Sequence, residues 1–97
     1  MLTEFPADQF LDFLRANPAR RFEYFDTKKC AVASFAREVL GWYLARAGGD
    51  YVRSGDYAPV KLPRFVCDGL SNASHLPNHH CAFTVAEALA EILKLKG

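Results

Sequence analysis

The clearest helical pattern in the chain is DTKKCAVASFAREVLGWYLARAGG, residues 26–49. Asp26 or Thr27 can cap its start, because a short polar side chain accepts a hydrogen bond from a first-turn N–H. The apolar positions at helical spacing are Val32, Phe35, Ala36, Val39, Leu40 and Tyr43. Gly48-Gly49 provides the stop, since glycine accepts the left-handed backbone that follows a helix end. The pattern predicts one long helix, which we expect to be the most secure element of the fold.

Two further helices flank this one. Residues 6–16 carry an apolar stripe at helical spacing, and the stretch ends at Asn17-Pro18, because proline pushes the preceding residue out of the helical region. The last helix starts at Thr84-Val85-Ala86-Glu87, a capping box in which hydroxyl and carboxylate each accept a hydrogen bond from the other residue's N–H.

The segments between the helices favour extended structure. Residues 20–26 are rich in aromatics and have no helical period, and residues 51–61 predict a weak hairpin around Ser54-Gly55-Asp56. Leu62-Pro63 can open a short helix to about Leu70, and residues 71–80 are polar and loop-like. The sequence thus predicts one α+β domain over residues 1–97, mostly α, with three main helices and a short extended or hairpin segment in the middle.

The composition excludes several classes of protein. The chain has 97 residues, of which 51% are hydrophobic and 24% charged, so wholesale disorder is excluded. No apolar run approaches the roughly 18–20 residues that span a bilayer, and the start of the chain lacks the apolar region of a secretory signal. We therefore expect a cytoplasmic protein with no membrane partner, in which Cys30, Cys67 and Cys81 are free thiols.

Positive charge gathers in the middle of the chain, although the net charge is only +1. The segment RRFEYFDTKK, residues 20–29, interleaves basic and aromatic side chains, a mixture typical of protein interfaces and of nucleic-acid binders. The small net charge makes nucleic acid the less favoured partner. The predicted contact surface comprises Arg20, Arg21, Tyr24, Lys28, Lys29, Arg53 and Lys61.

A second hypothesis is a metal- or thiol-dependent enzyme. The residues that suggest it are Cys30, Cys67, His75, His79, His80 and Cys81. Thiolates and imidazoles bind zinc, but the chain lacks a Cys-x2-Cys pair, and three of the candidates are consecutive. A thiol near a helix start and two lysines can have a lowered pKa, which is how cysteine nucleophiles are activated. We predict no metal, no cofactor and no catalytic residue, and keep the enzyme as the alternative to a binding protein.

The runs Phe22-Glu23-Tyr24-Phe25-Asp26 and Cys30-Ala31-Val32-Ala33-Ser34-Phe35-Ala36-Arg37 resemble a pattern in small uncharacterised proteins of bacteriophages and prophages. Leu62-Pro63 and Phe83-Thr84 are similar to the later part of that pattern. Within this class, anti-CRISPR proteins are similar to the chain in size and single-domain form.

This resemblance implies binding to a host defence complex, such as a CRISPR effector, and its inhibition through a rigid protein surface. A nucleic-acid-binding regulator is the third hypothesis, and homodimerisation is compatible with all three.

Overall fold

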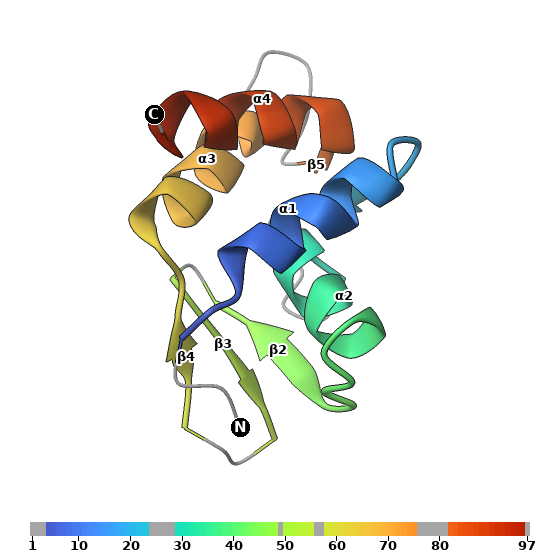
Figure 1. Cartoon of the computed structure of the whole chain (residues 1–97), viewed down its shortest axis with the longest axis vertical. Helices are drawn as coiled ribbons and strands as arrows, with labels where there is room; N and C mark the ends of the chain where they lie inside the picture. The colour runs from blue at the N-terminus through green and yellow to red at the C-terminus, as the bar shows by residue number, and fades with distance from the viewer. Residues whose placement is uncertain (1–3, 24–28, 49, 56–57, 76–81, 97) are drawn as a thin grey trace.

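The protein is an α+β domain whose described residues form four helices and five strands (Figure 1). The computed structural model describes residues 4–23, 29–48, 50–55, 58–75 and 82–96. The elements are α1 (Ala7–Ala16), β1 (Arg21–Glu23), α2 (Ala31–Glu38), β2 (Ala45–Ala47), β3 (Tyr51–Ser54), β4 (Val60–Lys61), α3 (Arg64–Ser74), β5 (Ala82–Thr84) and α4 (Val85–Lys96). The α+β class is confirmed, and the prediction of three main helices is wrong by one.

The elements form two regions joined by α1 and α2. Helices α3 and α4 pack together at one end of the molecule, and the β2–β3–β4 sheet forms the other end (Figure 1). Strands β1 and β5 form a separate antiparallel pair in which Phe22 lies opposite Phe83. The extended character predicted for residues 20–26 is confirmed at β1, whereas residues 24–26 lie outside the described part of the chain.

Both flanking helices begin as predicted. Helix α1 buries Phe10, Leu11, Phe13 and Leu14, the predicted stripe. At the start of α4, the backbone N–H of Thr84 donates to Glu87 Oε1 at 2.8 Å, and the N–H of Glu87 donates to Thr84 Oγ1 at 3.2 Å. Helix α3 runs to Ser74, four residues further than expected, so residues 71–74 are helical and not part of a loop.

The long helix predicted over residues 26–49 is wrong. Helix α2 ends at Glu38, and Gly41 follows with a φ of 73°. The N–H of Trp42 donates to Ala36 O at 2.9 Å, so the chain folds back over the helix end through this glycine. Residues 45–47 then form β2, so the chain turns back instead of extending the helix.

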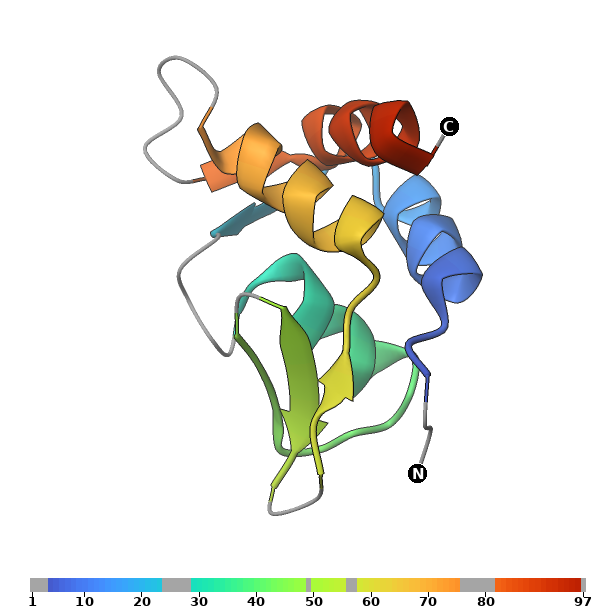
Figure 2. The ribbon, with the colours of Figure 1, turned by 90° about the vertical axis from the view of Figure 1, so that its left-hand side faces the viewer.

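The predicted hairpin is confirmed and gains a third strand. Strand β3 pairs with β4 as expected and also with β2, all antiparallel. Alternate side chains point to opposite faces: Ala45, Ala47, Val52 and Val60 are buried, whereas Arg46, Tyr51, Arg53 and Lys61 are exposed. Helix α2 lies against the sheet and covers its apolar face (Figure 2). Among the described residues, the other face of the sheet is exposed and carries three cations, Arg46, Arg53 and Lys61.

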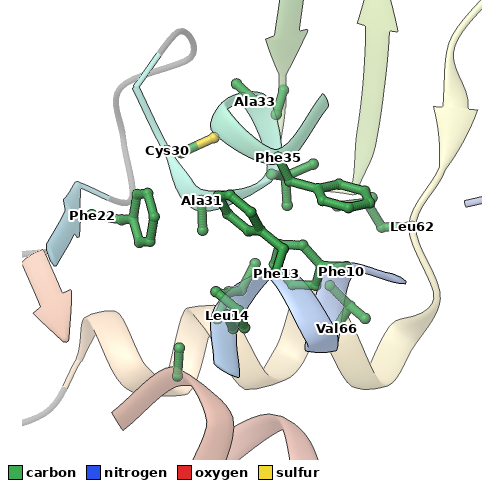
Figure 3. Close-up of a cluster of buried hydrophobic side chains, with 14 of the residues drawn as sticks. Phe10, Phe13, Leu14, Phe22, Cys30, Ala31, Ala33, Phe35, Leu62 and Val66 are labelled. Atoms are coloured by element: carbon green, nitrogen blue, oxygen red, sulfur yellow. The ribbon is translucent and has the colours of Figure 1, made fainter. Parts of the chain in front are cut away.

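Aromatic rings fill the core between α1 and α2. Phe10 and Phe13 of α1 face Phe35 of α2 with ring centroids 5.4 and 5.6 Å apart, and Phe22 lies beside them (Figure 3). Such tilted and edge-on ring pairs contribute about 0.5–1.5 kcal/mol each beyond their buried area. Through this cluster α2 packs on α1, and α2 in turn packs against β2 and β3 of the sheet.

Candidate functional site

An open groove lies where α2, β2 and β3 meet. Its volume is about 610 Å³, and its lining residues are Lys29, Arg37, Tyr43, Leu44, Ala45, Arg46, Arg53 and Gly55. Of these eight described lining residues, four are cations and none is an acid. Tyr43 and Leu44, which directly precede the edge strand β2, are 85% and 61% exposed. The groove therefore offers positive charge and an apolar surface side by side.

Arg46 and Arg53 lie opposite each other in the sheet, which is an unfavourable position for two like charges. They are direct partners across β2 and β3, and both are exposed on the same face. Like charges directly opposite in an antiparallel pair destabilise it. No ion pair joins either arginine to a carboxylate within the described residues. By this rule we expect the pair to lower the stability of the sheet, and no carboxylate of the described residues is paired with its two guanidinium groups.

The other two cations of the groove come from the helical side. Lys29 precedes α2, and Arg37 lies in its last turn, where Arg37 Nη2 donates to Ser34 Oγ at 3.5 Å. Both residues add positive potential to the groove. Each also has interactions within the chain.

Arg20, predicted as a contact residue, has a structural role. Its guanidinium forms a two-bond pair with Glu38, at 2.8 and 3.0 Å. The same group lies over the rings of Phe13 and Phe22, 5.5 and 4.9 Å from their centroids. Arg20 thus ties the start of β1 to the end of α2, and two of its five N–H donors are used in the pair with Glu38.

The remaining predicted contact residues are spread over the molecule. Lys29 and Arg53 line the groove, and Lys61 lies on the exposed face of the sheet opposite Tyr51. Arg21 is exposed on β1, in the other strand pair. Tyr24 and Lys28 lie outside the described residues. The structure therefore gathers two of the seven residues in the groove and a third on the adjoining sheet face.

The residues of the enzyme hypothesis are placed only in part. Cys30 is buried at the N-cap of α2, and Cys67 Sγ lies 3.7 Å from Leu62 O. Burial raises the pKa of the Cys67 thiol, and the nearby Asp50 and Asp68 carboxylates raise it further. His75 is exposed, with Nδ1 2.7 Å from Ser71 O. His79, His80 and Cys81 lie outside the described residues, and among those described no three potential ligands form a metal site.

The sequence reasoning missed Arg37, Tyr43, Leu44 and Arg46. The predicted long helix placed Tyr43 on a buried face. It also gave no reason to place Arg37 and Arg46 in the same site. Two signals were present in the sequence: the glycine at 41 and the aromatic pair Trp42-Tyr43 that follows it. A glycine in a helical pattern near its end is a C-cap candidate, and aromatic residues favour strands.

The comparisons with known proteins do not identify the chain: no protein-family model, curated protein or solved structure matches it. Within the described residues, no helix is long and apolar enough to cross a membrane.

Proposed function

We propose that the protein is a small binding domain that contacts an acidic surface of a partner protein through the groove between α2, β2 and β3. The supporting observation is the exposed Arg46–Arg53 pair, which costs the sheet stability and has no internal counterion among the described residues. The repulsion between the two guanidinium groups disfavours the free protein. An anion that binds between them offsets this repulsion.

The neighbouring apolar side chains favour a protein partner. Tyr and Arg are enriched at protein interfaces, and Leu44 adds an exposed apolar surface to the same groove. The affinity of a protein for nucleic acid rests largely on contacts between several cationic side chains and phosphates. The groove offers four cations, of which Lys29 and Arg37 already interact within the chain.

The resemblance to small bacteriophage and prophage proteins suggests the class of partner. We propose a host defence complex, such as a CRISPR effector, whose function is inhibited when the groove is occupied by an acidic part of one subunit. The fixed support that the Phe10, Phe13 and Phe35 cluster gives to α2 suits this role, because a rigid surface loses little entropy on binding.

Affinity capture tests this function. The tagged protein is passed over lysates of bacteria that contain CRISPR effectors, and the bound proteins are identified and quantified by mass spectrometry. We expect a stoichiometric effector subunit that is retained at moderate salt and released at high salt. Recovery of the chain without any such subunit, from lysates in which the effectors are verified to be present, would contradict the proposal.

A further inference from the structure

We infer that the groove binds an extended segment of the partner that carries an acidic residue and, two positions away, an apolar residue. The carboxylate lies between Arg46 and Arg53, and the apolar side chain lies against Leu44. This inference rests on the proposed function and specifies the chemistry that the groove recognises.

The ladder between β2 and β3 places the two guanidinium groups side by side. The N–H of Gly48 donates to Tyr51 O at 2.9 Å, and the N–H of Gly55 donates to Leu44 O at 3.3 Å. The pair Arg46–Arg53 lies midway between these bonded pairs, so by the alternation of an antiparallel ladder it is also hydrogen-bonded, with Cα atoms about 5.5 Å apart. Two planar guanidinium groups that start this close together can both donate to the oxygens of one carboxylate.

Leu44 continues the same face of the sheet. Exposure alternates along this segment: Leu44 and Arg46 are exposed, and Ala45 and Ala47 are buried. Gly55, which is opposite Leu44, has no side chain, and its open position lies 3.7 Å from Leu44 Cδ1. Because Gly55 has no side chain, it leaves this side of Leu44 uncovered, two residues from Arg46.

The distance between the two features matches an extended peptide. Two residues of a β-strand span about 6.6–6.8 Å and return side chains to the same side. A segment running along β2 therefore brings an acidic side chain to the arginine pair and an apolar side chain to Leu44 at once. Tyr43, which is 85% exposed and lines the same groove, provides a second apolar contact.

Peptide titration tests this inference on the whole chain. The probe is a blocked octapeptide that alternates serine with aspartate and leucine in turn. Backbone N–H and arginine Nε–H signals of the ¹⁵N-labelled protein are followed by NMR. We expect the signals of Arg46, Arg53 and Leu44 to shift, and the affinity to fall about tenfold or more when asparagine replaces aspartate.

Three comparisons make the result specific. A peptide of the same composition with aspartate and leucine adjacent should bind more weakly than the alternating peptide. Arg46→Gln and Arg53→Gln should each weaken binding about tenfold, and the matched control variants Arg15→Gln and Arg64→Gln should leave it unchanged. Equal affinity for the asparagine peptide, or signal shifts outside the groove, would overturn the inference.

Other occupants give distinct results. An eight-nucleotide oligothymidylate that binds the groove more tightly than the acidic peptide would identify a nucleic-acid site instead. Concentration-dependent broadening of the same signals without peptide would identify a second copy of the chain as the occupant. If Arg46→Gln/Arg53→Gln still captures the effector, the arginine pair is refuted as the contact, while binding to the effector stands. If the groove binds the peptide but the protein captures no effector, only the proposed partner is refuted.

Discussion

Arg46 and Arg53 face each other directly across β2 and β3, although neither is paired with a carboxylate in the described part of the chain. A sheet selected only for stability would place an opposite charge or a β-branched side chain at one of these positions. The pair lines a groove that also exposes Tyr43 and Leu44. Stability and binding are therefore expected to change in opposite directions when either arginine is replaced.

The first prediction concerns the stability of the sheet. Arg53→Thr should raise the free energy of unfolding by about 0.2–1 kcal/mol, because it removes a like-charge contact and introduces a residue that favours strands. Urea unfolding followed by circular dichroism measures the change. The gain should shrink at high salt, where the repulsion in the wild-type protein is screened. A loss of stability on this substitution would show that Arg53 stabilises the free protein.

The second prediction concerns the contact between α3 and α4. A Cβ atom at Gly69 would lie 2.6 Å from the Cα of Ile92 and 2.8 Å from its backbone N. Gly69→Ala should therefore destabilise the protein by about 1–3 kcal/mol, because the two helices must move apart. This loss exceeds the gain of about 0.5–1 kcal/mol that alanine gives in a helix interior. An unchanged or higher melting temperature would contradict the close contact.

The third prediction assigns Arg20 to stability rather than to binding. Arg20→Gln should cost about 1 kcal/mol, because it removes the two-bond pair with Glu38 and the stacking over Phe13 and Phe22. A double-mutant cycle with Glu38→Gln isolates the ion pair and should give a coupling energy of about 0.2–1 kcal/mol. Peptide affinity should not change. A loss of affinity with unchanged stability would return Arg20 to the contact surface.

The fourth prediction concerns pH. The pKa of Cys67 is raised in the folded protein, first by burial and then by Asp50 and Asp68. The folded state therefore holds this proton more tightly than the unfolded state does, and stability falls as the pH rises from the ordinary thiol pKa toward the raised value. Cys67→Ser should flatten the decline in unfolding free energy over this alkaline range. Identical pH profiles for the variant and the wild-type protein would contradict the shift.

Local signals predicted the parts of the fold that local interactions determine. Helix α1 begins and ends near the proline residues that punctuate its pattern, and α4 begins at its capping box, where Thr84 and Glu87 satisfy each other's backbone. The hairpin of β3 and β4 was also predictable, because the sequence has a glycine at its turn. In the structure this Gly55 adopts a φ of 56°. Each of these features is determined within a few residues.

The middle of the chain was mispredicted because two local patterns compete there. The apolar spacing of residues 32–43 fits a helix, yet Gly41 permits a left-handed backbone and Trp42 closes the helix onto Ala36. Pairing with β3 then stabilises residues 45–47 as a strand, and that partner is not visible in the helical spacing. Tertiary pairing thus overrides a helical pattern that is long but interrupted by one glycine.

Because residues 26–49 were predicted as one helix, the candidate site could not be assembled from the sequence. Arg46 and Arg53 are seven residues apart in the sequence, and only the register of β2 against β3 makes them neighbours. A linear basic-aromatic segment pointed instead to Arg20, whose charge is used inside the fold. The basic character of the middle of the chain was predictable from composition, whereas the arrangement of its charges depends on the strand register.

The most direct test of the account is the amount of CRISPR effector captured by Arg46→Gln/Arg53→Gln relative to Arg15→Gln/Arg64→Gln. Both variants lose two arginine charges, but only the first alters the groove. We expect the groove variant, although folded and no less stable than the wild-type protein, to capture at least tenfold less effector, and the control to capture the wild-type amount. Equal capture by the two variants would contradict the claim that the arginine pair forms the binding site.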